Sequence, residues 1–140
     1  MHDPPRILIV DDNETNRCLL TARLGAEGYE TTEAENGERA LAVAHEVAPD
    51  VVLLDVMMPK IDGFEVCRRL KVDTTLGFVP IIMVTARADS KDVVTGLNAG
   101  ADEYLTKPID HAALVARVRS MLRIKELHDR VEAQAVELAS

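Results

Sequence analysis

Three aspartates, a threonine and a lysine stand out because each ends or follows a short apolar run of the sequence. In chain order they are Asp11, Asp12, Asp55, Thr85 and Lys107. Carboxylate and hydroxyl oxygens are the donors that a hard cation such as Mg²⁺ prefers, and an ammonium beside them suits the oxygens of a phosphoryl group. An aspartate in such a group can also act as a nucleophile, since carboxylates form acyl phosphates.

Each of these residues also has an ordinary structural explanation. An aspartate after a strand often caps a helix, threonine is common in strands, and a lysine is usually solvated. If these ordinary explanations held, it would be chance alone that places all five residues at the ends of apolar runs. Three carboxylates held close together repel one another, so the set also requires positive charge. Lys107 supplies one unit and a divalent cation would supply more.

Short apolar runs alternate with segments of helical periodicity along the whole chain. The expected strands are 6–10, 29–34, 51–55, 79–86 and one within 102–108, and the expected helices are 14–28, 36–48, 62–73, 90–100 and 110–138. Asn36, Asp62 and Asp110 stand where three of these helices begin and are suited to capping.

Strands that are apolar throughout are typical of a parallel sheet that helices cover on both faces. With right-handed crossovers, five strand–helix units give an α/β fold, a doubly wound sandwich of three layers. Ligands bind such sheets beyond the carboxyl ends of the strands. We therefore expect Asp11, Asp12, Asp55, Thr85 and Lys107 to meet at one edge of the sheet. Asp55 is the best candidate nucleophile, because it ends the most apolar strand.

The composition narrows the class of protein further. The length of 140 residues fits one domain. The net charge of −8 disfavours nucleic-acid binding, because the phosphate backbone of a nucleic acid is also negative. Cys18 and Cys67 lie in helix-like segments without paired spacings, which indicates reduced thiols and a cytoplasmic location. The start "MHDPPR" lacks the apolar core of a signal peptide, and no apolar run is long enough to span a membrane. The histidines are expected to be solvated: His2, His45, His111 and His128.

Four motifs in order resemble the receiver domain of response regulators from bacterial two-component systems. They are "DD" at 11–12, "LLDVMMPKIDG" at 53–63, "TA" at 85–86 and "YLTKP" at 104–108, and the resemblance covers about residues 5 to 124. It implies a flavodoxin-like strand order of 2-1-3-4-5. It also implies a signalling domain that accepts a phosphoryl group from a sensor histidine kinase or a phosphotransfer protein, and that catalyses only its own phosphorylation and dephosphorylation.

The resemblance assigns a role to each matching residue. Asp55 would be the phosphoacceptor. Mg²⁺ would be held by Asp12 directly, by Asp11 through water, and by Asp55 and the backbone carbonyl of Met57. The phosphate would contact Lys107 and the N–H of Ala86, Thr85 would be the switch hydroxyl, and Tyr104 would be the switch aromatic. A cis peptide would precede Pro108.

Two other classes of protein share parts of this pattern. A dehalogenase-type phosphatase would need an acid two residues after its nucleophile, where this chain has Met57. A flavin carrier would need a hydroxyl- and glycine-rich loop after the first strand, where this chain has the acidic "DDNET". Within the family, a stand-alone phosphorelay regulator that acts by protein contact remains the alternative to a domain that controls an output.

The last helix is longer than the sheet requires. Leu114, Val118, Met121 and Leu122 make an inner face, and residues 1–123 would complete the receiver domain. Beyond it, Ile124, Leu127, Val131, Gln134 and Leu138 alternate in spacings of three and four, as at the core positions of a coiled coil. We expect residues 124–140 to form a helical extension that pairs in a parallel homodimer and leads to an output domain outside this chain. The stretch resembles helices that precede diguanylate cyclases; a frayed, solvated tail is the other interpretation.

Overall fold

Strands and helices alternate along the chain in the computed structural model, which describes residues 1–86 and 90–139. The strands are β1 (Arg6–Val10), β2 (Glu30–Ala34), β3 (Val51–Asp55), β4 (Ile81–Thr85) and β5 (Glu103–Thr106). The helices are α1 (Glu14–Ala26), α2 (Gly37–Val47), α3 (Gly63–Val72), α4 (Ser90–Asn98) and α5 (His111–Ala139). The predicted order of elements is confirmed.

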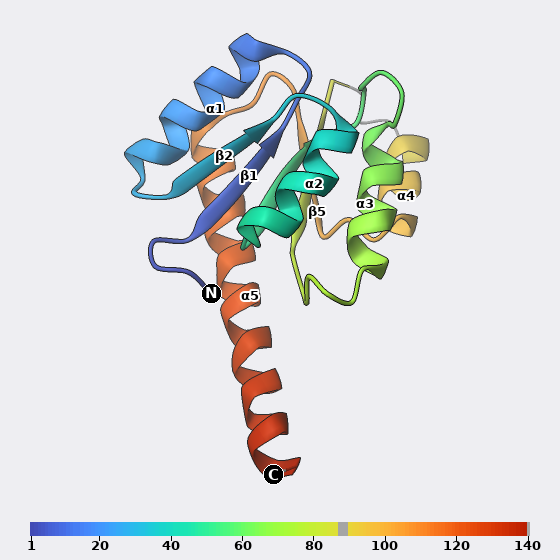
Figure 1. Cartoon of the computed structure of the whole chain (residues 1–140). Helices are drawn as coiled ribbons and strands as arrows, with labels where there is room; N and C mark the ends of the chain where they lie inside the picture. Colours follow the sequence, from blue (N-terminus) through green and yellow to red (C-terminus); the bar gives the residue numbers. More distant parts are fainter. Residues whose placement is uncertain (87–89, 140) are drawn as a thin grey trace.

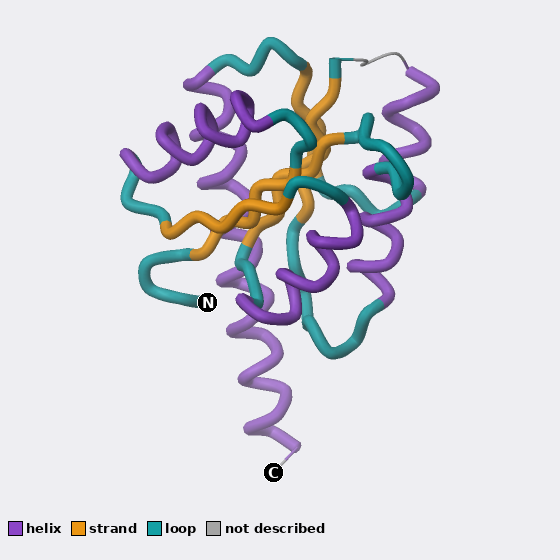
Figure 2. The backbone as a smooth tube through the Cα atoms, turned by 45° about the horizontal axis from the view of Figure 1, so that its top comes forward, coloured by secondary structure: helices purple, strands orange, loops and turns teal. Residues whose placement is uncertain are grey.

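The strands form one parallel sheet in the order β2-β1-β3-β4-β5, which confirms the predicted flavodoxin-like topology. Every residue of β3 and β4 is buried, whereas the edge strands β2 and β5 are partly exposed. Figure 2 shows the sheet as the middle layer between helices on its two sides. All strands run the same way, so their carboxyl ends share one edge.

Two apolar clusters hold the layers together. On one face, Leu20 and Leu24 of α1 meet the α5 residues predicted as its inner face, Leu114, Val118, Met121 and Leu122. On the other face, side chains of α2 and α3 pack on β1, β3 and β4. In Figure 1 the lower half of α5 continues away from the sheet, beyond the other helices. Among the described residues, no helix is both long enough and apolar enough to cross a lipid bilayer.

The predicted caps are present. The side chains of Asn36, Asp62 and Asp110 accept hydrogen bonds from backbone N–H groups of the first helical turns at 2.8, 2.9 and 2.9 Å. The fourth strand is shorter than predicted, since it begins at Ile81 and not at residue 79. Proline has no N–H with which to pair, so Pro80 precedes the regular ladder.

The prediction that the histidines are solvated fits His45 and His111, which are exposed, but His2 and His128 are half-buried. The rings of His45, His2 and His128 also make close contacts. The His45 ring lies 2.6 Å from a carboxylate oxygen of Asp73. The His2 ring lies 2.9 Å from the carbonyl oxygen of Ala48, and the His128 ring stacks on Phe78. Each of these three rings touches a neighbouring segment, which the sequence alone does not reveal.

Gly63 fixes the distance between the start of α3 and the end of β3. Its N–H donates to the carbonyl of Val56 at 2.9 Å. A Cβ at this position would lie 2.2 Å from the carbonyl oxygen of Asp55 and 2.8 Å from the Cα of Val56. Both neighbours are backbone atoms beside Asp55, so only glycine allows this approach.

We predict that Gly63→Ala lowers the free energy of unfolding by about 2 to 3 kcal/mol, because the backbone of β3 or α3 must move. Gly25→Ala is the matched control. It changes another helical glycine, whose Cβ would meet nothing within 4 Å, and should stabilise the protein by up to about 1 kcal/mol. Urea unfolding of both variants measures the difference; equal effects would contradict the close approach at Gly63.

Candidate functional site

Three carboxylates gather at the carboxyl edge of the sheet. One oxygen from each of Asp11, Asp12 and Asp55 lies within 4.8 Å of the others. Asp11 and Asp55 are 2% and 4% exposed, whereas Asp12 faces solvent. The expected meeting of these residues is therefore found, since Asp11 and Asp12 follow β1 and Asp55 ends the adjacent β3.

Asp11 is held in place by three donors. The backbone N–H of Asn13 donates to its Oδ1 at 2.9 Å. The side chains of Lys107 and Asn16 lie 3.2 and 3.4 Å from its Oδ2. The Asn13 side chain also caps α1 by accepting from the N–H of Asn16. The sequence reasoning missed both asparagines, although an asparagine directly before a helix is a known capping signal.

Lys107 reaches the cluster from the end of β5. Its Nζ lies 3.2 Å from Oδ2 of Asp11 and 3.6 Å from Oδ1 of Asp55. Its backbone N–H donates to the carbonyl of Thr85 at 2.8 Å, which ties this loop to β4. The peptide between Lys107 and Pro108 is cis, as the resemblance implied. A cleft of about 230 Å³ opens beside Asp11 and Lys107, between α1 and the loop before α5.

The environment of Asp55 disfavours its charge. Burial raises the pKa of its carboxyl group to about 6, and the negative charges of Asp11 and Asp12 act in the same direction. Lys107 and the backbone N–H of Met57, which lies 3.4 Å from Oδ1, oppose the rise in pKa. At neutral pH the carboxylate is charged but only partly compensated, so the site favours the arrival of a cation.

The predicted switch residues lie on neighbouring strands. Thr85 is buried at the end of β4, and Ala86 follows it at the surface. Tyr104 is half-buried on β5, away from the carboxylates. Its hydroxyl donates to the carbonyl of Asp92 on α4 at 3.3 Å. Its ring lies so close to α4 that a Cβ on Gly96 would be 2.6 Å from Cε2. The site thus adjoins α4 through β5.

Met57 lies in the loop after Asp55 with its side chain 57% exposed. The role expected for its carbonyl, as a metal ligand, stays a prediction. So do the roles assigned to the other site residues.

Comparisons with known proteins agree on one family. A family model described as "Response regulator receiver domain" matches residues 7–119. The chain is 51% identical over 126 residues to the response regulator PleD of Caulobacter vibrioides, a match that covers 90% of this chain and 28% of that protein. It is 43% identical over 119 residues to the DNA-binding dual master transcriptional regulator RpaA of Synechocystis, covering 85% of this chain and 49% of that protein.

A solved structure shares this fold over most of the chain. The chemotaxis protein CheY4 of Vibrio cholerae superposes with a TM-score of 0.80 at 31% identity, covering 84% of this chain and 98% of that one. The curated relatives are longer: the chain spans about a quarter of the length of PleD and about half that of RpaA.

The raised pKa of Asp55 makes a prediction about stability and pH. The folded state holds the proton with a pKa of about 6, against an ordinary value of 3.8. Well below pH 3.8 both states are protonated and the group has no effect. Between pH 3.8 and about 6 the unfolded state releases the proton while the folded state keeps it, so the folded state loses at most about 3 kcal/mol relative to the unfolded state. Asp55→Asn removes this cost, so without metal it should be more stable than wild type at pH 7, with the gain small at pH 4 and absent at lower pH.

Urea unfolding at pH 4 and pH 7 in the presence of EDTA measures this effect. Asp62→Asn is the control, because Asp62 is exposed and asparagine caps a helix as well as aspartate does. If Asp55→Asn gained no more than the control at pH 7, the carboxylate would not be destabilised in the fold.

Proposed function

This chain belongs to the response regulator receiver domain family, and we propose that Asp55 accepts a phosphoryl group from the phosphohistidine of a sensor kinase or a phosphotransfer protein. The observation that carries the proposal is the buried Asp55 carboxylate, with Lys107 at 3.6 Å and two further acids beside it. A nucleophile, a cation for the phosphoryl oxygens and a metal-binding acid pair are together what phosphoryl transfer requires.

The donor set fits Mg²⁺, since it offers only oxygen atoms and carries excess negative charge. We propose that Asp12 binds the ion directly, Asp11 through water, and Asp55 and the carbonyl of Met57 complete the protein ligands. The ion would offset the charge that the carboxylates and the phosphoryl oxygens bring together. Asp12, the exposed member of the cluster, lies where an ion can enter.

In the proposed reaction, an Asp55 oxygen attacks phosphorus as the bond to the histidine nitrogen breaks. An acyl phosphate forms, and the imidazole keeps the electron pair of the broken bond. Lys107 and the N–H of Ala86 would hold the phosphoryl oxygens. Attack of water on the same phosphorus would later release inorganic phosphate and restore the carboxylate. In this proposal the domain catalyses only these two reactions on itself.

We propose that phosphate biases an equilibrium between two arrangements of the neighbouring strands. Thr85 would turn its hydroxyl toward the phosphate, and Tyr104 would turn inward in response. Two contacts support this role. The backbone N–H of Lys107 is hydrogen-bonded to the carbonyl of Thr85, and the hydroxyl of Tyr104 is hydrogen-bonded to a carbonyl of α4. A movement at the phosphate would therefore reach α4 through adjacent residues.

The output lies outside this chain in our proposal. The relatives are two to four times longer than the matched region, which favours a domain that controls an output over a stand-alone regulator. The expectation of no nucleic-acid contact concerns these 140 residues and stays a prediction, because RpaA is named a DNA-binding regulator. Free thiols at Cys18 and Cys67 fit a cytoplasmic location.

We further propose that the chain forms a parallel homodimer through the α5 extension. Leu127, Val131 and Leu138 are 53%, 64% and 88% exposed. Two heptads pair weakly alone. In a parallel pair the two receiver bodies lie at the same end of the paired helices, and in our proposal phosphorylation adds contacts there through the face near Tyr104.

Phosphate uptake tests the main proposal. Incubation with a small phosphodonor and Mg²⁺ should give the wild-type chain one acid-labile phosphate, and Asp55→Asn should give none, because its amide cannot form the acyl phosphate. Asp62→Asn, in the same loop, should be labelled like wild type. Intact-protein mass spectrometry counts the phosphates; labelling of Asp55→Asn at the wild-type level would contradict the assignment.

Metal binding makes a separate prediction. Mg²⁺ should raise the melting temperature of the wild-type chain, since an ion that binds only the folded state adds about 2.7 kcal/mol at a hundredfold excess over Kd. Asp12→Ala should lose this response, yet melt no lower than wild type in EDTA, because it removes repulsion. Glu35→Ala, an exposed acid outside the cluster, should keep the response. An Asp12→Ala variant that melts much lower in EDTA would instead give the cluster a structural role.

A further inference from the structure

The inner face of α5 changes character where the helix leaves the sheet. Leu114, Val118 and Met121 recur at spacings of four and three and are buried against the sheet. The same spacing continues through Lys125, His128 and Glu132, so these polar residues lie on the same side of the helix. The same face of α5 therefore continues along the side of the body, but its residues are polar from Lys125 onward.

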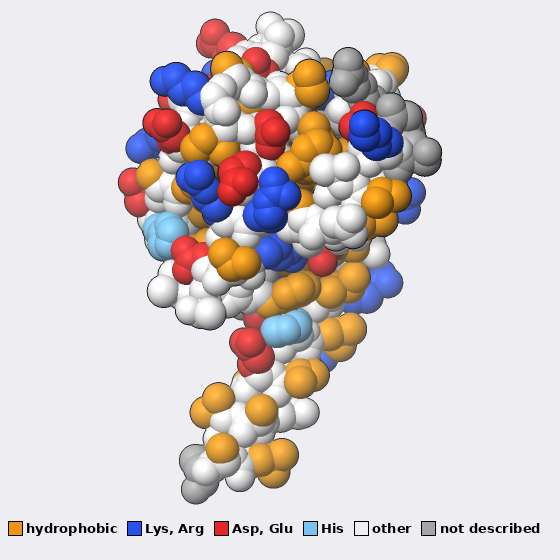
Figure 3. Space-filling view, turned by 90° about the vertical axis from the view of Figure 1, so that its right-hand side faces the viewer, with side chains coloured by type: hydrophobic (Ala, Val, Ile, Leu, Met, Phe, Trp, Pro, Cys, Tyr) orange, Lys and Arg blue, Asp and Glu red, His pale blue; other side chains and the backbone are white. Residues whose placement is uncertain are grey.

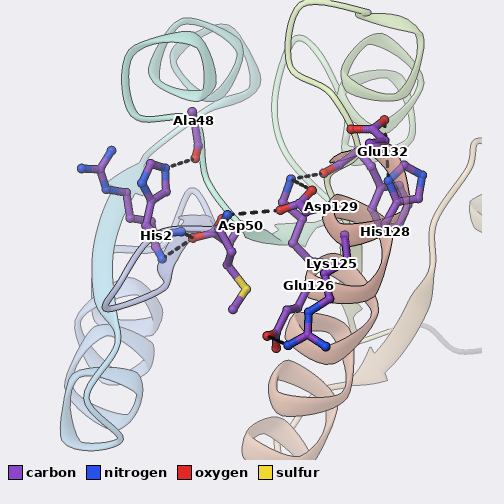
Figure 4. Close-up of polar contacts among 12 residues, drawn as sticks. His2, Ala48, Asp50, Lys125, Glu126, His128, Asp129 and Glu132 are labelled. Carbon is purple, nitrogen blue, oxygen red and sulfur yellow. Dashed lines mark hydrogen bonds and ion pairs between the residues drawn. The ribbon is translucent and has the colours of Figure 1, made fainter. Parts of the chain in front are cut away.

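This polar face contacts the body at several points, which Figure 4 shows in part. The Lys125 ammonium donates to the carbonyl of Phe78 at 2.7 Å and lies 3.1 Å from Asp129. The His128 ring stacks on the ring of Phe78, with centroids 4.2 Å apart and an angle of 18° between the planes. The other oxygen of Asp129 lies 3.2 Å from the amino group of Met1. The contacts extend beyond Arg123, the limit predicted for the receiver domain.

Phe78 also contacts α3. The ammonium of Lys71 lies 5.0 Å from the centre of the Phe78 ring. It also donates to the carbonyl of Val79 at 2.8 Å and lies 2.6 Å from Asp102. Asp102 in turn accepts from the N–H of Ile81, the first residue of β4, at 2.8 Å. The segment that α5 contacts is thus fastened to the sheet.

Asp129 is placed for ion pairing. His128, Asp129 and Glu132 could together hold a metal ion, but each oxygen of Asp129 already lies within 3.2 Å of an ammonium group. The local negative charge is therefore compensated within the chain, and the contacts between helix and body explain the grouping without a metal.

We propose that Lys71, Phe78, Lys125, His128 and Asp129 form a latch that clamps the projecting part of α5 to the receiver body. The latch keeps this part of the helix formed in the single chain, and it decides which face a second copy can use. The second half of this inference rests on the homodimer proposed above, whereas the first half does not.

The face left for a second copy is apolar. At 100° per residue, Ile124, Leu127, Val131 and Leu138 centre about 120° around the helix from the latch residues of α5. Figure 3 shows hydrophobic side chains spaced along this projecting part of the molecule. The latch residues are engaged with the body, and a helix pairs in parallel with its own copy through alternating spacings of three and four. The occupant we commit to is therefore the same stripe of a second copy.

Hydrogen exchange of the monomer tests the latch itself. Wild-type amides at 126–133 should be protected, and Lys125→Met should exchange them about tenfold faster, because a charge-assisted bond to the body is lost. Phe78→Leu should act in the same direction, since it removes the stacking with His128. Sedimentation at the concentration used establishes that the chain is monomeric.

Arg130→Met is the matched control for Lys125→Met. Both replace a cation whose partner lies four residues away, but Arg130 pairs at 2.7 Å with Glu126 on the exposed side of the helix. Arginine, lysine and methionine have similar helix propensities. Less than a twofold change is expected for the control. Equal changes in Lys125→Met and Arg130→Met would overturn the latch.

Cysteine cross-linking tests the pairing face. Cys18→Ser removes the exposed thiol, while Cys67 can stay because it is buried and burial raises its pKa to about 11. In this background, with Mg²⁺ and beryllium fluoride, Leu127→Cys should form a disulfide with its copy under mild oxidation. Glu132→Cys, on the latch face, should not.

The two experiments distinguish a failure of the latch from a failure of the proposed homodimer. Efficient cross-linking of Glu132→Cys would overturn the assignment of faces. If neither cysteine cross-links and sedimentation shows only monomer, the homodimer falls and the pairing half of the inference falls with it. Hydrogen exchange still decides on the latch in that case, because it is measured on the single chain.

Discussion

The interaction on which the site depends is the repulsion between buried carboxylates at the end of the sheet. Asp55 and Asp11 are nearly inaccessible to water, and the ammonium of Lys107 lies close to both. Burial raises the pKa of Asp55 to about 6, so the folded state holds charge that it does not fully compensate. Burial of the apolar strands β3 and β4 stabilises the fold and offsets the cost of this uncompensated charge. The same repulsion favours the binding of a divalent cation and, in the proposed function, of a phosphoryl group whose oxygens share that cation.

Much of the fold could be predicted from the sequence because each level of the pattern agrees with the others. The apolar run of β3, the caps at Asn36 and Asp62, and the periodicity of α5 indicate the same α/β sandwich. The strand limits could be predicted less closely. Pro80 is apolar and continues the run before β4, but it cannot donate to the ladder, so the strand starts at Ile81 and not at residue 79.

The site was predictable in its principal residues and not in those that hold them. Asp11, Asp55 and Lys107 could be placed at one edge because parallel strands end together. Asn16 could not, because its contact with Asp11 depends on how α1 turns after its cap. The latch residues were harder still. Lys125 and His128 are polar residues at helical spacing, a pattern that ordinarily indicates a solvated face, and their partner Phe78 is 47 and 50 residues away in sequence.

The positions of the site and the latch constrain how one can influence the other. Thr85 is the last residue of β4, and Phe78 lies just before its amino end, so the length of this fully buried strand separates the two regions. A central strand in a close-packed core has little freedom to slide. In the proposed function, a signal from the site would therefore pass sideways, from Thr85 and Lys107 to β5 and from Tyr104 to α4, and would then alter how the helices present their outer faces. The latch keeps the α5 extension fixed to the body. If the helix instead frayed at residue 124, a change in the orientation of the receiver body would not be passed on to the extension.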